Sequence, residues 1–156
     1  NRIALAEECM RHQMYPEAAK LLESCLTGAF AADGNILLGL ARAYVEGQHW
    51  EKAKSAVHKA QEAAPNQRPQ DASLLEARIL EGQGEHDAAI SAYRKLIPSF
   101  VGLEARYRYG CLLSKIGHHS AATQVFDEVI MHSKRFASSL EDEQRWAAAA
   151  RQAIAG

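Results

Sequence analysis

The residues of this sequence that most readily do chemistry are its histidines, of which there are seven. Two histidines one helical turn apart, as in H-E-x-x-H, would supply two ligands of a zinc site, but no pair here has that spacing. Several of them fall in segments that we expect to be turns. We interpret them as polar turn and surface residues, and we predict no metal site and no cofactor. The turn histidines are His49, His86, His118 and His119.

The cysteines give no stronger indication of catalysis. Cys9, Cys25 and Cys111 are far apart and form no C-x-x-C pair, which is typical of reduced, small hydrophobic residues in a cytoplasmic protein. Cys111 falls in the middle of an expected helix, away from the electropositive helix start that favours a thiolate. The sequence also lacks a P-loop and a G-x-S-x-G motif. We therefore predict that the protein is not an enzyme.

Composition narrows the class of protein further. The chain has 156 residues, 47% of them hydrophobic and 24% charged, which is typical of one soluble globular domain. With 18 Lys and Arg against 19 Asp and Glu, it has no excess of positive charge to neutralise phosphates, so nucleic-acid binding is disfavoured. No apolar run reaches the roughly 18 residues of a membrane helix. Because the chain begins at Asn1 instead of Met, a membrane anchor further upstream is left open.

The elements that must position these side chains repeat along the chain. Four segments share a small residue followed twelve positions later by an alanine, and the small residues recur at intervals of 35, 36 and 33. Such a period indicates a helix-turn-helix repeat, in which two helices approach closely where their side chains are small. The pairs are Ala6 with Ala18, Ala41 with Ala53, Ala77 with Ala89, and Gly110 with Ala122.

The turns and helix ends agree with this repeat. Pro16 suits the first turn of a helix, where its missing N–H is not needed. Pro65 is expected to end the helix that begins near Trp50. Gly47 and Gly117 fall where a helix end favours a left-handed residue.

These residues resemble the tetratricopeptide repeat family, most closely from Trp50-Glu51-Lys52-Ala53 to Pro65, and at Tyr109-Gly110 with Leu113, Gly117, Ala122 and Phe126. The resemblance covers roughly residues 3 to 134, and the whole is also similar to divergent bacterial proteins of this kind. It implies an all-α fold, a right-handed α-solenoid of about four helix-turn-helix repeats in a single domain, 1–156. The expected repeats are approximately 3–33, 34–69, 70–101 and 102–135. Glu76 and Pro98 depart from the family pattern.

A last helix, 138–155, is expected to cover the end of the stack. Ser138 or Ser139 is its predicted N-cap, with Glu141 or Asp142 in the capping-box position. An alternative is that this helix is offered to a partner. Its apolar face comprises Leu140, Trp146, Ala147, Ala150 and Ile154.

The resemblance also implies an inner, concave surface lined by the first helix of each pair. Arg42 and Arg78 fall at equivalent positions and would form part of a basic stripe able to bind carboxylates of an incoming peptide. The alternative is ordinary surface charge, with Arg42 paired to Glu46 and Arg78 to Glu81 along their helices. Our candidate contact residues are Arg42, Glu46, Arg78, Tyr107, Arg108 and Lys115, within an implied inner surface that also includes Glu7, Asn35, Leu38, Leu74 and Cys111.

From these residues we predict a non-enzymatic protein–protein interaction module or scaffold that binds a peptide or partner protein, acidic if the stripe is used, in the concave groove. The second hypothesis is a self-associating or membrane-tethered assembly scaffold, which leaves a homo-oligomer open. The chaperone C-termini that some family members bind are not expected, because the Lys and Asn set used for them is absent. The expected location is the cytoplasm, with an anchor only through a segment upstream.

Overall fold

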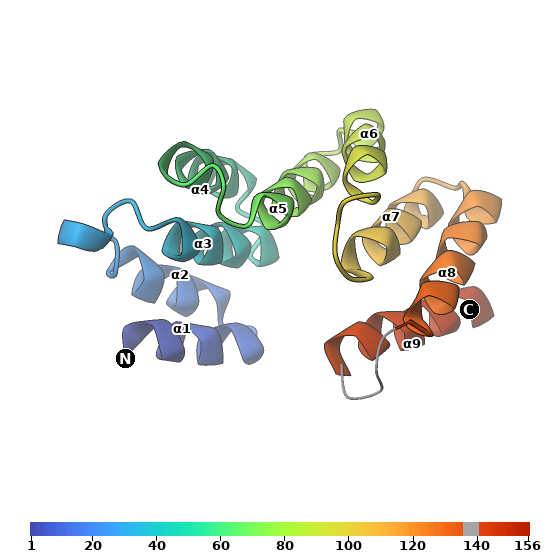
Figure 1. Ribbon diagram of the computed structural model, residues 1–156, viewed down its shortest axis with the longest axis horizontal. Coiled ribbons are helices and arrows are strands. Elements are labelled where there is room, and N and C mark those ends of the chain that lie inside the picture. Colours follow the sequence, from blue (N-terminus) through green and yellow to red (C-terminus); the bar gives the residue numbers. More distant parts are fainter. Residues whose placement is uncertain (136–140) are drawn as a thin grey trace. The chain divides into compact units, whose positions relative to one another are not determined.

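The computed structural model describes residues 1–135 and 141–156. All regular structure in these ranges is helical (Figure 1). None of the described helices is long and apolar enough to cross a lipid bilayer. The helices are α1 (Arg2–Arg11), α2 (Tyr15–Glu23), a 3₁₀ helix η1 (Gly28–Phe30), α3 (Gly34–Glu46), α4 (Trp50–Ala63), α5 (Pro69–Gly82), α6 (His86–Leu96), α7 (Glu104–Lys115), α8 (His119–Ser133) and α9 (Glu141–Ala155).

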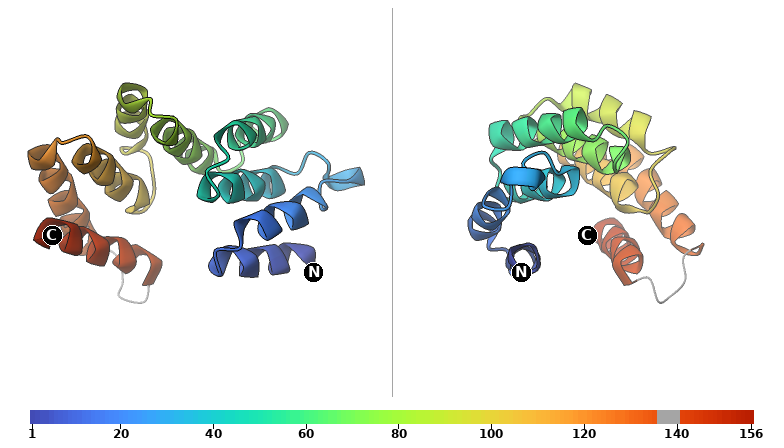
Figure 2. Two further views of the ribbon diagram at one scale, coloured as in Figure 1. Left: turned by 180° about the vertical axis from the view of Figure 1, so that it is seen from behind. Right: turned by 60° about the vertical axis from the view of Figure 1, so that its left-hand side comes forward.

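The chain divides into two compact units, Asn1–Glu85 and His86–Gly156. In the first unit each helix packs on its neighbour in sequence, and α5 also contacts α3 (Figure 2). In the second unit α7 packs on α6 and α8, and α9 packs on α8 and α7. The predicted single domain, 1–156, and the predicted repeat boundaries stay predictions.

Small residues lie where helices cross, as the repeat requires. Ala18, Ala41 and Ala53 are fully buried in the first unit. In the second unit, a Cβ atom added to Gly110 of α7 would lie 2.7 Å from the ring of Phe126 on α8. The close approach of paired helices therefore depends on the absence of larger side chains at these positions.

The turns follow the sequence prediction only in part. Pro16 lies in the first turn of α2 as expected, and Gly117 takes the left-handed conformation after α7 with φ of 90°. Gly47, however, has φ of −81°, and the left-handed residue of that turn is Gln48, with φ of 61°. The left-handed position that the sequence analysis assigned to Gly47 is therefore occupied by the next residue, Gln48.

The last helix, α9, has one buried face, which is formed by its own alanines. Ala147 and Ala150 are completely buried, and the carboxylate of Glu143 accepts a hydrogen bond of 2.7 Å from the backbone N–H of Leu103, just before α7. Ile154, which we expected on the same apolar face, is 39% exposed. The predicted caps Ser138 and Ser139, and Leu140, lie outside the described residues.

Candidate functional site

Three of the six candidate residues lie in the first unit, on α3 and α5. Asp33 starts α3 by accepting a hydrogen bond from the backbone N–H of Ile36, and the helix then carries Arg42 and Glu46 one turn apart. Arg78 of α5 donates to Glu46 across 2.9 Å, and their side chains are only 12% and 25% exposed. This ion pair therefore joins the two helices and lies largely out of water.

The alternative pairing along α3, Arg42 with Glu46, does not form among the described residues. The packing of α5 on α3 brings Arg78 to Glu46 instead, and a half-buried partner gains more from a carboxylate than an exposed one does. Arg42 itself is exposed. In the part of the chain that the structure describes, Arg42 makes no hydrogen bond or ion pair, so its guanidinium is available to another molecule.

In the second unit, Tyr107 of α7 packs between two other aromatic side chains. Its ring centroid lies 5.8 Å from that of Phe126 on α8 and 5.4 Å from that of Trp146 on α9. Burial, together with a hydrogen bond to Cys111, raises the pKa of Tyr107 to about 12. The ring that we predicted as an anchor for a partner is thus partly buried by contacts within the chain, and its role as an anchor stays a prediction.

The two remaining candidates, Arg108 and Lys115, differ in whether a carboxylate of the chain pairs with them. Arg108 pairs with Glu104 at 3.0 Å, and its guanidinium lies 5.4 Å from the centroid of the Trp146 ring. Lys115, at the end of α7, is exposed and has no ion pair among the described residues. Of the four predicted cations, two are therefore neutralised by carboxylates of the chain, and Arg42 and Lys115 are not.

The sequence did not predict the cleft beside Leu38. This residue of α3, which the resemblance assigned to an inner surface, is only 4% exposed. It forms part of the wall of a cleft of about 260 Å³ between α3, the end of α4 and the start of α5. Pro65 and Pro69, which mark the connection between α4 and α5, were the available signal. The other lining residues are Ala60, Gln61, Ala64, Gln67, Ala72 and Ser73.

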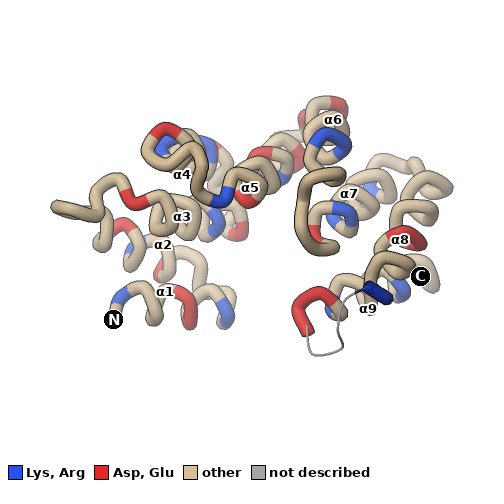
Figure 3. The backbone as a smooth tube through the Cα atoms, in the orientation of Figure 1, with Lys and Arg blue, Asp and Glu red and all other residues tan. Residues whose placement is uncertain are grey.

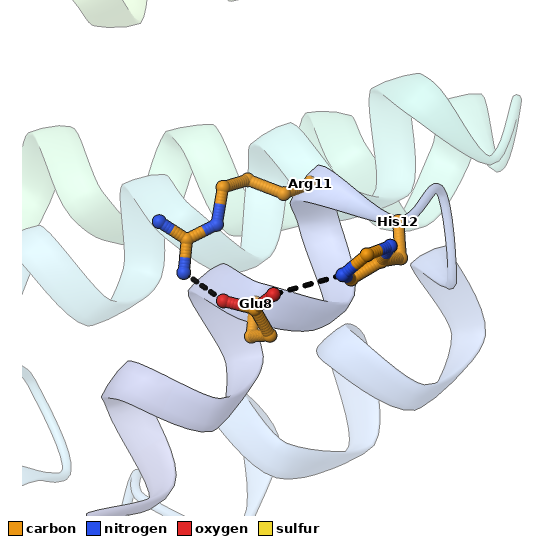
Figure 4. Close-up of polar contacts among 3 residues, drawn as sticks. All are labelled: Glu8, Arg11 and His12. Carbon is orange, nitrogen blue, oxygen red and sulfur yellow. Dashed lines mark hydrogen bonds and ion pairs between the residues drawn. The ribbon is translucent and has the colours of Figure 1, made fainter.

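Two histidines lie in surface ion pairs, His12 directly after α1 and His58 within α4. Glu8 accepts from both Arg11 and His12, the latter at 2.8 Å (Figure 4). These hydrogen bonds, first that of Arg11, lower the pKa of the exposed Glu8 carboxyl. His58 lies 3.3 Å from Glu62, one turn further along α4. Across residues 1–135 and 141–156, no group of histidine, cysteine and acidic side chains could hold a metal ion.

Charges of both signs are interspersed along the helices of each unit (Figure 3). An acidic first turn starts α9, with Glu141, Asp142 and Glu143, which is the favourable end of the helix dipole for carboxylates. Helices α1 and α5 each carry both basic and acidic residues.

Comparisons with known proteins agree with this architecture. Two profiles described as tetratricopeptide repeat match residues 10–79 and 71–97, together more than half of the chain. None of the curated proteins matches. Among solved structures, the one named MamA AMB-1 is similar with a TM-score of 0.57 and 20% identity, over 81% of this chain and 68% of that one.

At that identity the structural likeness concerns the fold alone, and it supports the all-α solenoid that the family resemblance implied. Repeats of this kind generally mediate protein–protein interaction, and they typically belong to non-enzymatic modules. The chain belongs to the tetratricopeptide repeat family.

Proposed function

We propose that this chain is a non-enzymatic scaffold that binds a peptide or partner protein on the inner surface of its repeats. The observation that carries this proposal is the unpaired state of Arg42 on α3, beside the paired Arg78 and Glu46. A cation that no carboxylate of the described chain neutralises is available for a carboxylate of a partner. Lys115 supplies a second such charge on α7.

The structure changes which residues the proposal uses. Arg78 and Arg108 are engaged by Glu46 and Glu104, and Tyr107 is covered by Trp146. We therefore assign these three to holding the helices together, and Arg42 and Lys115 to contact with a partner. A groove that reads acidic segments remains the proposed mode of binding.

The test is affinity capture from a native extract with the intact chain and with the double variant Arg42→Glu/Lys115→Glu. A matched control, Lys54→Glu/Lys95→Glu, makes the same charge change in each unit at exposed lysines that make no ion pair in the described chain. We expect the double variant to lose partners that the control keeps. Equal capture by both variants would remove the two cations from the proposal.

Self-association is the alternative, and light scattering over a range of concentrations separates it from binding of another protein. A mass that rises with concentration, and returns to that of the monomer in the Arg42→Glu/Lys115→Glu variant, would make a second copy the partner. A constant mass would leave the heterologous partner as the proposal.

A further inference from the structure

The cleft beside Leu38 has the size of a site for one side chain. Its volume is about 260 Å³, below the roughly 300–1,000 Å³ of sites that enclose whole small molecules. Most of its wall is apolar, with Leu38, alanines and two prolines, and its polar groups are the side chains of Gln61, Gln67 and Ser73. Such a wall favours an aliphatic or aromatic side chain over a polar one.

Residues that line the cleft make close contacts within the first unit. Gln67 and Ala64 pack so closely on Gly34 that a Cβ atom there would lie 2.5 Å from Gln67 Oε1 and 2.9 Å from the Ala64 Cβ. Gln61 of α4 donates to Glu76 of α5 across 3.0 Å, which ties together the two helices on either side. A pre-formed cleft reduces the ordering cost of binding.

The charge next to this cleft is that of Arg42. Leu38 and Arg42 lie one turn apart on α3, which places their Cβ atoms about 5–6 Å from each other on one face. Two other arginines of these helices already have carboxylates, since Arg78 pairs with Glu46 and Arg68 pairs with Asp71 at 2.6 Å. Among the arginines near this cleft, Arg42 is thus the one whose charge a ligand can neutralise.

We propose that the cleft over Leu38 receives one apolar side chain of an acidic protein segment, whose carboxylate about one helical turn away binds Arg42. This inference rests on the proposed function and names the chemistry of the partner. The apolar side chain supplies burial, and the carboxylate supplies orientation through a charge-assisted, bidentate hydrogen bond. Because both contacts must form at once, the ligand must hold its apolar side chain and its carboxylate at one fixed spacing.

Selection of random short peptides displayed on phage against the full chain tests this chemistry without a known partner. We expect the selected peptides to share an apolar residue and an Asp or Glu three or four positions apart. The strongest is then synthesised with blocked termini, together with one version that has the carboxylate changed to its amide and one that has the apolar residue changed to Ala. Affinities are measured by fluorescence anisotropy.

Arg42→Gln is expected to weaken the acidic peptide about tenfold and to leave the amide version unchanged. Ser73→Leu, which fills the cleft, should weaken both, and Lys54→Gln is the matched control with no effect. The alanine peptide tests the cleft in the unaltered protein, in case Ser73→Leu lowers stability.

Selected peptides without a carboxylate, or equal losses for Arg42→Gln and Lys54→Gln, would overturn the inference. So would a selection that yields no peptide, even while capture of a partner that depends on Arg42 upholds the proposed function. Failure of both experiments would overturn the two together.

Discussion

Arg42 and Arg78 are the same residue type on neighbouring helices, but their surroundings differ. Arg78 is 12% exposed and paired with Glu46, whereas Arg42 is exposed and has no partner in the described chain. Removing one member of a half-buried pair leaves the other charge poorly solvated. The two arginines therefore separate a structural role from a binding role.

We expect Arg78→Ala to lower the free energy of unfolding by roughly 1–3 kcal/mol, because it leaves the Glu46 carboxylate between α3 and α5 without its cation. Arg42→Ala should change it by less than about 0.5 kcal/mol, as is usual for an exposed residue without partners. Urea denaturation followed by circular dichroism measures both. Equal losses for the two variants would contradict the assignment of Arg42 to the free surface.

The pKa of Tyr107 reports whether α9 covers α7. Burial and the hydrogen bond to Cys111 raise it to about 12, against about 10 for an unfolded tyrosine. Between these values the folded protein binds the proton that the unfolded chain releases, so stability present below pH 10 is lost as the pH rises towards 12. Burial and Glu23 also raise the pKa of Tyr44 to about 12, so the titration of Tyr44 likewise lowers stability as the pH rises.

Trp146→Ala should bring the pKa of Tyr107 down towards 10, because it uncovers the ring. The change is measured by the ultraviolet absorbance of phenolate during a pH titration, with Tyr107→Phe in the same background to identify its signal among the five tyrosines. An unchanged titration of Tyr107 would mean that Trp146 does not shield it.

At the scale of helices, substitution by alanine is expected to change stability in opposite directions at two glycines in helix interiors. A Cβ atom at Gly39 of α3 would make ordinary contacts with Leu22, the nearest at 3.6 Å, so Gly39→Ala should gain up to about 1 kcal/mol of helix propensity. At Gly110 the new atom would lie 2.7 Å from the Phe126 ring. There the cost of overpacking, about 1–3 kcal/mol, outweighs the same gain.

Thermal unfolding of the two alanine variants, each compared with the unaltered chain, decides this point. The melting temperature should rise for Gly39→Ala and fall for Gly110→Ala. A rise for both would show that α7 and α8 separate easily enough to admit a methyl group, and the small-residue crossing would then not be required in the second unit.

The sequence predicted helices better than it predicted their contacts. Periodic small residues and Pro16 and Pro65 marked helix pairs and ends, because these signals act within a few residues. The partner of Glu46 depends on how α5 lies against α3, and local spacing favoured Arg42 instead. The covering of Tyr107 likewise depends on Trp146, 39 residues further along the chain, which no local rule connects to it.

At the scale of the whole chain, the first unit has a hydrophobic core of its own. One cluster of buried residues runs from Ala6 to Ile79 and lies entirely within residues 1–85. Solenoid repeats draw their stability from neighbouring repeats, so a compact stack of helices keeps most of its contacts when separated from the rest. The Arg42 side chain and the cleft over Leu38 both belong to this unit.

We therefore expect a fragment of residues 1–85 to be helical by circular dichroism and to unfold cooperatively. Once folded, it should bind the selected acidic peptide with an affinity within a few fold of that of the full chain, because every residue assigned to that contact is present. A fragment that folds but loses most of this affinity would show that residues of the second unit take part in binding. The Lys115→Gln variant of the full chain would then be the first to measure, since Lys115 is the remaining unpaired candidate cation among the described residues.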